Sequence, residues 1–264
     1  MKKIIALLLA LTLVLTMVGC GGKKEYLAGT VSDTGVVAIG VPGQPANTDP
    51  ALYDGSLAAR AVLGMLYQGL TAVDENGQAV GAAAESWEIS PDGRVYTFHL
   101  RRGVTFSDGT PFDAEAVRLN MDAIIANRLR HAWLDMINEI ERHEVVDSHT
   151  WRLVLKHPYY PTLIELGLLR PFRFISPSCF IDGQTRNGVR GLVGTGPWVL
   201  KEHKENQYAL FTANPSYWGE KPRLQAVRWK VMPDHQAILL ALHKGDVDLV
   251  VGADGDMLNL DNFD

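Results

Sequence analysis

The sequence predicts an α/β fold, because stretches with the periodicity of strands alternate along the chain with stretches of helical periodicity. Val36–Val41 is a compact apolar run, which is typical of a buried strand in a mixed sheet. Leu57–Leu66 follows with apolar residues at helical spacing. Near the other end, residues 227–231 alternate like a strand, and Asp234 can cap the helix that follows. These alternations predict a sheet packed against helices around a sizeable core.

Residues 82–118 carry the densest turn and strand signals in the chain. Pro91-Asp92-Gly93 predicts a tight turn, since proline presets φ and glycine tolerates positive φ. Val95–Leu100 then alternates, so its aromatic and leucine residues fall on one face. Residues 104–106 are expected to return as a second strand, and a helix capped by Asp113 follows. The stretch therefore predicts a hairpin that leads into a helix.

The remaining elements are placed by periodicity and by the residues that interrupt it. Helices are expected over residues 113–126, 132–140 and 162–169. Strands are expected over residues 144–146, 151–155, 207–211 and 247–251, and a loop or crossover over residues 188–197. Residues 170–174 cannot be interior helix, because Pro171 lacks the backbone N–H that a helix needs.

The first residues have the pattern of a targeting segment. Two lysines precede an apolar stretch over residues 4–18, and the sequence MVGC at residues 17–20 resembles a lipobox. The apolar stretch is short for a membrane span, so we expect residues 1–19 to be removed as a lipoprotein signal peptide. Cys20 would then be lipidated, and residues 20–35 would form a flexible tether outside the cytoplasm. The alternative is an uncleaved membrane anchor.

Composition narrows the class of protein further. Removal of residues 1–19, which hold two lysines and no acidic residue, would take the formal net charge from −5 to −7. An acidic chain argues against a nucleic-acid partner. If Cys20 is lipidated, Cys179 has no partner for a disulfide within the chain, and it is expected to be a small buried residue.

No motif for catalysis is present in the sequence. There is no G-x-S-x-G, no phosphate-binding glycine loop and no H-E-x-x-H, and the eight histidines include no pair at i+3 or i+4. His143, His149 and His157 flank strand signals and are expected at the surface. The sequence therefore predicts a protein that is not an enzyme, with no catalytic residue and no assigned metal ligand.

Two long stretches resemble a known family. The order AESW…SPDGRVYTFHLRRGVTFSDGTPFDAEAV resembles the signature of the family 5 extracellular solute-binding proteins, and GTGPWVLKEHKENQYALFTANPSYWGEKP resembles a second signature of that family. The resemblance implies a periplasmic-binding-protein fold of the large type II class, in which two lobes enclose a ligand. It implies that residues 36–264 form most of the first lobe, without the second, and that the partners are the permease and ATPase subunits of an ABC importer.

Within the family, local motifs resemble the nickel-binding branch. One is RLRHAW at residues 128–133, and the other is YYP at residues 159–161 followed by LRPFRF at residues 169–174. In that branch the metal arrives held by a small chelator that bears carboxylates. The resemblance implies a lipid-anchored receptor for a nickel chelate, with nickel bound to histidine or to a small carboxylate metallophore. It implies no cofactor beyond this ligand.

The resemblance also implies roles for four residues. Arg130 and Arg170 would bind the carboxylates of the chelator, Trp133 would stack beside it, and Tyr53 would lie in a loop that faces the ligand cleft. Guanidinium suits this use, because it pairs with carboxylate through two hydrogen bonds and stays charged when dehydrated. Ala58 stands where the nickel receptors carry a methionine, and the histidine that ligates nickel in that branch comes from the second lobe.

Other interpretations remain open from the residues alone. Arg130 can simply end a helix, Arg170 can occupy a surface turn, and Tyr53 can pack in its loop. A receptor for di- or oligopeptides in the same family is the alternative function. A secreted metalloenzyme is a more remote alternative, from a different class.

Overall fold

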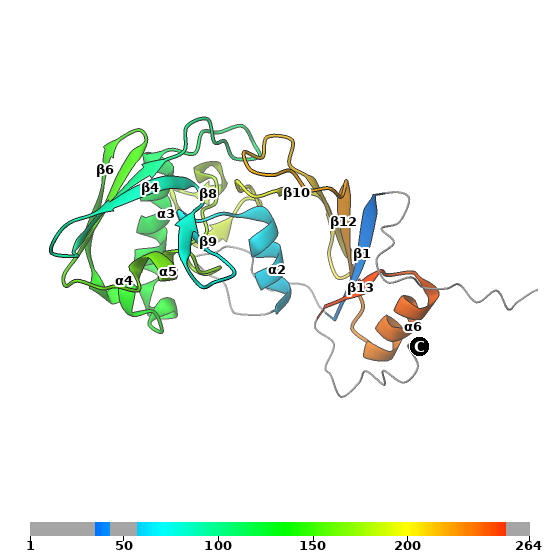
Figure 1. Cartoon of the computed structure of the whole chain (residues 1–264). Helices are drawn as coiled ribbons and strands as arrows, with labels where there is room; N and C mark the ends of the chain where they lie inside the picture. Colours follow the sequence, from blue (N-terminus) through cyan, green and yellow to red (C-terminus); the bar gives the residue numbers. More distant parts are fainter. Residues whose placement is uncertain (1–34, 43–56, 252–264) are drawn as a thin grey trace, which may run out of the picture. The chain divides into compact units, whose positions relative to one another are not determined.

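A computed structural model of the chain describes residues 35–42 and 57–251, all of which belong to one unit, Asp33–Asp264 (Figure 1). Cys20 and Tyr53 lie outside the described residues. Two sheets dominate the described part, and each has its own apolar core. The expectation of an α/β fold is confirmed.

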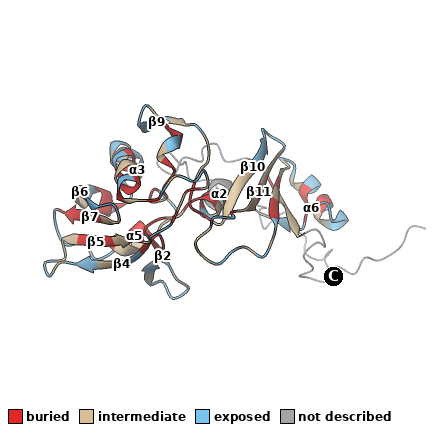
Figure 2. Ribbon diagram, turned by 90° about the horizontal axis from the view of Figure 1, so that it is seen from above, coloured by how far each residue is buried: buried red, intermediate tan, exposed pale blue. Residues whose placement is uncertain are grey.

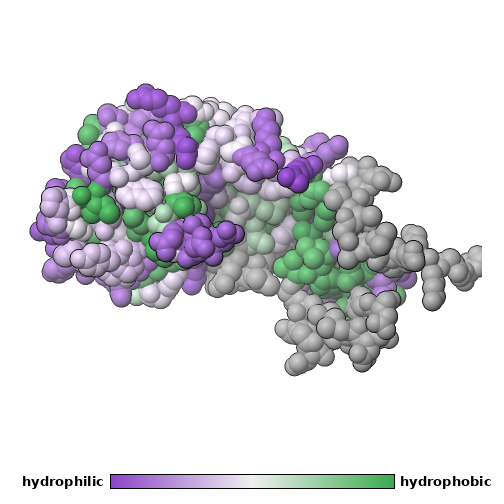
Figure 3. Space-filling model, viewed as in Figure 1, coloured by the Kyte–Doolittle hydropathy of each residue, from purple (hydrophilic) through white to green (hydrophobic). Residues whose placement is uncertain are grey.

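The larger sheet has five strands in the order β10-β11-β12-β1-β13. Its strands are β1 (Val36–Val41), β10 (Trp198–Lys204), β11 (Tyr208–Ala213), β12 (Ala226–Val231) and β13 (Leu249–Val250). β1 is parallel to β12 and β13, whereas β10, β11 and β12 are antiparallel, so the predicted mixed sheet is confirmed. In Figure 3, apolar side chains gather over β12 and the strands beside it.

Two helices pack on this sheet. α2 (Leu57–Leu66) contributes Leu63 and Leu66 to a buried cluster with Phe211 and Trp229 of the sheet. α6 (His235–Lys244) connects β12 to β13, and its Ile238 lies next to Gly40 of β1. Asp234 caps α6 as predicted, because its carboxylate accepts from the amide of Ala237 at 2.8 Å.

The smaller sheet is antiparallel throughout and has the order β4-β5-β7-β6. Its strands are β4 (Ala84–Ile89), β5 (Val95–Leu100), β6 (Ile140–Asp147) and β7 (Thr150–Leu155). Tyr96, Phe98 and Leu100 of β5 are all buried, so the predicted apolar face of this strand is confirmed. Phe98 packs against Trp151 of β7, with their ring centroids 5.7 Å apart.

α3 (Ala114–Ala126) covers this sheet, and its buried residues lie on the side toward the core (Figure 2). The carboxylate of Asp113 caps it as predicted, by accepting from the amide of Ala116 at 2.9 Å. The smaller elements are the hairpin of β2 (Thr71–Val73) with β3 (Ala79–Gly81), the pair β8 (Phe180–Ile181) and β9 (Gln184–Val189), the helices α4 (Asp135–Glu139) and α5 (Thr162–Leu166), and the 3₁₀ turns η1 (Arg128–His131) and η2 (Pro177–Cys179).

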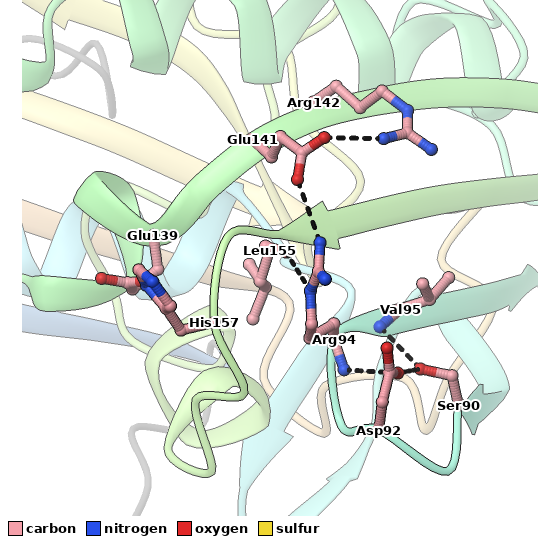
Figure 4. A network of polar contacts seen from close by, with 9 residues as sticks. All are labelled: Ser90, Asp92, Arg94, Val95, Glu139, Glu141, Arg142, Leu155 and His157. Atoms are coloured by element: carbon pink, nitrogen blue, oxygen red, sulfur yellow. Dashed lines mark hydrogen bonds and ion pairs between the residues drawn. The ribbon is translucent and has the colours of Figure 1, made fainter.

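The turn at Pro91-Asp92-Gly93 is confirmed, and Figure 4 shows how its polar groups are satisfied. The carboxylate of Asp92 accepts from the hydroxyl of Ser90 and from the amide of Arg94. These hydrogen bonds hold the pKa of the Asp92 carboxyl below its ordinary value. Arg94 extends from the turn to the carbonyl of Leu155 at 3.1 Å and to Glu141 at 3.2 Å.

Several predicted elements are wrong in extent. The helix expected over residues 132–140 is only α4, because Ile140 leaves it to begin β6 and pairs with Leu155. The helix expected over residues 162–169 ends at Leu166. Residues 104–106 form a single bridge, between Thr105 and Pro111, in place of a strand. The strand expected over residues 247–251 is only β13, and the loop expected over residues 188–197 begins inside β9.

Among the isolated side chains, Cys179 is buried as predicted. The expectation for His143 is wrong. Its side chain is only 8% exposed, because the bulged strand β6 turns it toward Trp151 and α3. His157, in contrast, has a side chain that is 76% exposed, as expected for a surface residue.

Candidate functional site

The structure brings Trp133 and Arg170 together, although 36 residues separate them in the sequence. The guanidinium carbon of Arg170 lies over the indole of Trp133, 4.7 Å from its centroid, which is the geometry of a cation–π contact. Trp133 remains 50% exposed and Arg170 is half-buried, so the pair borders the solvent. Such a contact uses the face of the guanidinium, whereas its N–H donors lie in its plane and can bind a carboxylate.

Trp133 is carried by the segment between α3 and α4. The amide of Asn127 donates to carbonyls of the last turn of α3 and ends that helix. η1 follows, and the amide of Leu134 then donates to the carbonyl of His131 at 2.9 Å. Leu134 and Met136 are buried in the core, which fixes the segment and leaves Trp133 at its surface.

Arg130 lies on the same segment, in η1, three residues before Trp133. It is exposed, and its amide donates to the carbonyl of Asn127 at 2.9 Å. α3 ends at Ala126, so Arg130 does not lie in the last turn of that helix. Its place on the short turn next to Trp133 suits the predicted contact with a chelator.

Arg170 lies in the loop that follows α5. The guanidinium of Arg173 donates to the carbonyl of Gly167 at 2.8 Å and to that of Phe172 at 3.2 Å, so residues on both sides of Arg170 are joined. Burial lowers the pKa of Arg173 to about 10, which still leaves it charged at neutral pH. The Arg170–Pro171 peptide bond is cis, and the loop is not helical, as Pro171 predicts.

Apolar side chains lie exposed beside the two cationic positions. Leu129 precedes Arg130 and is 88% exposed, and Leu169 precedes Arg170 and is 36% exposed. Each of these arginines therefore has an exposed apolar side chain next to it in the sequence. A guanidinium with an apolar neighbour can hold a small organic anion by its carboxylates and by its carbon skeleton.

The sequence reasoning missed two side chains that support the site. Arg173 was visible only as part of the motif RPFRF, and Glu165 carried no signal at all. Glu165 accepts from the hydroxyl of Tyr159 at 2.6 Å and from the amide of Met136 at 3.3 Å. These contacts cross between segments that the sequence separates, so periodicity could not have found them.

Within residues 35–42 and 57–251, no group of three or more His, Cys, Asp or Glu side chains is arranged to hold a metal ion. A search of the same described residues found no helix with the length and apolar character that a membrane crossing requires.

Comparisons with known proteins show which family the chain resembles. The family model for bacterial extracellular solute-binding proteins, family 5 Middle, matches residues 78–262. The nickel-binding periplasmic protein of Escherichia coli (strain K12) is 45% identical over 199 residues, which make up 75% of this chain and 38% of that protein.

Solved structures of periplasmic binding proteins also match the chain. NikA from Brucella suis, in complex with Fe(III)-EDTA, is 42% identical with a TM-score of 0.77, over 80% of this chain and 42% of that chain. DppA from Helicobacter pylori, an ABC transporter-associated periplasmic binding protein in complex with the peptide STSA, is 27% identical with a TM-score of 0.72, over 84% of this chain and 47% of that chain.

The chain spans about two fifths of the length of the E. coli nickel-binding protein and of NikA from Brucella suis. The expected fold, that of the type II periplasmic binding proteins, is confirmed by the structural matches. The family model covers well over half of the chain, and the E. coli relative shares 45% of its residues over the matched part. The chain belongs to the family 5 bacterial extracellular solute-binding proteins.

Proposed function

We propose that this chain is the ligand-binding part of a receptor that captures a nickel chelate outside the cytoplasm and delivers it to an ABC importer. The observation that carries the proposal is the contact between Arg170 and Trp133, with Arg130 on the adjoining turn. The 45% identity to a nickel-binding periplasmic protein supports the choice of metal. The protein would bind and release its ligand without chemical change.

The chemistry of the pair favours a chelate over a bare metal ion. A cationic guanidinium repels Ni²⁺ but binds the carboxylates of a chelator, while the indole can stack beside its carbon skeleton. The chelator would supply donor atoms to the metal, and the protein would recognise the complex through the chelator. The relative from Brucella suis was solved with Fe(III)-EDTA, whose chelator also carries carboxylates.

The partners in this proposal are the permease and ATPase subunits of the importer. Lipidation of Cys20, which lies outside the described residues, would anchor the receptor to the membrane and keep it near the permease. The remaining predicted contact, Tyr53, also lies outside the described residues, and its role in the ligand cleft remains a prediction.

The proposal is tested on a two-lobed receptor, in which the chain is joined to a second lobe of the family type. The wild type and two variants are titrated with nickel plus histidine, with nickel alone and with a panel of short peptides. Arg170→Ala should weaken binding of the nickel–histidine complex about tenfold to a hundredfold, since a hydrogen bond to a charged group contributes roughly 1.5–3 kcal/mol. Arg170→Lys should recover only part of this loss, because an ammonium lacks the planar fork. Equal binding of the chelate by wild type and Arg170→Ala would reject the proposal.

A receptor for short peptides is the second candidate. It is favoured by the 27% identity to DppA, which was solved with a peptide. The terminal carboxylate of a peptide could also bind Arg170, so the same residues would serve a different ligand. The peptide panel decides between the two, because a peptide receptor should bind without metal and gain nothing from added nickel.

A further inference from the structure

Glu165 joins the two segments that carry Trp133 and Arg170. It lies in α5, and its Oε2 accepts from the amide of Met136 in the first turn of α4, at 3.3 Å. Its own carbonyl accepts from the amide of Leu168 at 3.0 Å, on the path toward Arg170. We infer that Glu165 is a positioning residue, which holds the indole of Trp133 against the guanidinium of Arg170. Its consequence for ligand binding rests on the proposed function.

The carboxylate of Glu165 is itself fixed to the smaller sheet. Its Oε1 accepts from the hydroxyl of Tyr159 at 2.6 Å, and the carbonyl of Tyr159 accepts from the hydroxyl of Tyr96 in β5 at 3.1 Å. The hydrogen bond to Glu165, together with burial and nearby acidic charge, raises the pKa of Tyr159 to about 12. Tyr159 therefore stays a neutral donor at physiological pH, and both oxygens of the carboxylate are engaged.

The far end of α4 is held in a different way. Lys156, just after β7, donates its amide to the carbonyl of Glu139 at 2.8 Å and its ammonium to the carbonyl of Asn138 at 2.6 Å. The side chains of Glu139 and His157 lie 2.9 Å apart at the same end (Figure 4). These contacts fix the end of α4 to the sheet, whereas Glu165 bonds to its first turn, at Met136, three residues after Trp133.

The segment that carries Arg170 is also anchored away from Trp133. The hydroxyl of Thr71 in β2 donates to the carbonyl of Leu163 in α5 at 2.8 Å, and Arg173 joins the loop to Gly167. α5 is thus fixed to β2 on one side and bonded to the start of α4 through Glu165 on the other. Loss of that bond should let Trp133 shift relative to Arg170 while both segments keep their other anchors.

The test compares three variants of the full chain. Glu165→Ala removes both contacts of the carboxylate. Glu165→Gln keeps the shape, and its amide can still accept from Met136 and donate to Tyr159, so it should restore most of the positioning. Glu139→Ala is the matched control, because it removes a carboxylate from the far end of the same helix.

Two readouts are measured on each variant. The first is the indole resonance of Trp133 in the ligand-free protein, assigned by its loss in Trp133→Phe, which reports the position of the ring over Arg170. The second is the affinity for nickel plus histidine, measured with the same variants in the two-lobed receptor described above. Glu165→Ala should move the Trp133 resonance and weaken chelate binding roughly tenfold, as expected when a charged hydrogen bond is bent rather than removed. Glu165→Gln and Glu139→Ala should leave both readouts near their wild-type values.

The outcomes separate this inference from the proposed function. If the wild-type two-lobed receptor binds no nickel–histidine complex, the proposed function fails, and the ligand-free resonance still decides whether Glu165 positions Trp133. If the wild type binds the chelate but Glu165→Ala leaves the Trp133 resonance in place, the inference is wrong. The inference is also wrong if Glu139→Ala weakens binding as much as Glu165→Ala.

Discussion

At the scale of single residues, His143 shows how burial sets the charge of a side chain. Its ring lies 5.7 Å from that of Trp151, and its Nε2 is 3.2 Å from the carboxylate of Asp122. Burial lowers the pKa of His143, and this effect outweighs the attraction of Asp122; the nearby Arg118 lowers it further. The folded protein therefore resists protonation of a ring that protonates near its ordinary pKa of about 6.5 when the chain is unfolded.

This difference predicts a stability that depends on pH. Because the pKa of His143 is lower in the folded state, its contribution is present above pH 6.5 or so and is lost as the pH falls below that value. His143→Phe keeps an aromatic ring beside Trp151 but does not titrate. We expect the free energy of unfolding of His143→Phe, measured with urea, to fall less between pH 7.5 and pH 5.5 than that of the wild type. An equal loss in wild type and His143→Phe would show that burial of the His143 ring does not drive the pH dependence.

The geometry of the candidate site could be predicted from the sequence only in part. Arg130, Trp133 and Arg170 came from short motifs, and the structure adds the contact between Trp133 and Arg170 that no motif contains. The sequence-based role given to Trp133 was to stack beside the ligand; in the structure its ring already contacts Arg170. Glu165 was missed because its function depends on a contact with α4, across a distance of about 30 residues in the chain.

At the scale of elements, α2 and the loop after β9 approach each other unusually closely. A Cβ on Gly194 would lie 2.0 Å from the carbonyl oxygen of Leu66, and one on Gly196 would lie 2.4 Å from that of Met65. The amide of Gly196 donates to the carbonyl of Leu66 at 2.9 Å. Glycine is therefore required at these two positions, where loop backbone covers the end of the helix.

Two substitutions of glycine by alanine should have opposite effects. Gly194→Ala should lower the free energy of unfolding by about 2–4 kcal/mol, because the added methyl group overlaps the backbone of α2. Gly64→Ala, inside α2, should raise it by about 0.5–1 kcal/mol, since alanine is the better helix former. At Gly64 the nearest side-chain atom would be 3.6 Å away, which is an ordinary contact. Urea unfolding of both variants measures the difference, and a destabilised Gly64→Ala would contradict it.

Elements with a clear period or cap were predicted well. β5 alternates strictly, and α3 and α6 begin at aspartates whose carboxylates cap them. The helix expected over residues 132–140 was wrong because Ile140 pairs with Leu155, and such pairing with a distant strand overrides local helical spacing. The strand expected over residues 104–106 was also wrong. Phe106 is buried by packing against Phe112 rather than by a strand partner.

At the scale of the whole molecule, the predicted location at the membrane depends on lipidation of Cys20. If it is lipidated, Cys20→Ser should move the protein from the membrane fraction to the soluble fraction or leave its precursor uncleaved. Cell fractionation and mass measurement of the N-terminus check this. Unchanged processing together with unchanged membrane retention would contradict the expected lipoprotein.

The class of the fold was predictable because strands and helices alternate over the whole chain, and the family because two long stretches keep its order of residues. The division into two apolar cores could not be predicted from the sequence, since it depends on which strands pair. β1, near the start of the described chain, pairs with β12 and β13 near its end, and local patterns do not encode such partners.

The central claim is that Arg170 and Trp133 hold a carboxylate-bearing nickel chelate. It is tested most directly by adding the nickel–histidine complex to the two-lobed receptor and recording the indole resonances of this chain's six tryptophans. Paramagnetic nickel should broaden the Trp133 signal before that of Trp229, which is buried in the larger sheet, and zinc–histidine should broaden neither. Arg170→Ala should remove the selective broadening. A Trp133 signal that stays as sharp as that of Trp229, at nickel–histidine concentrations that saturate binding, would contradict the claim.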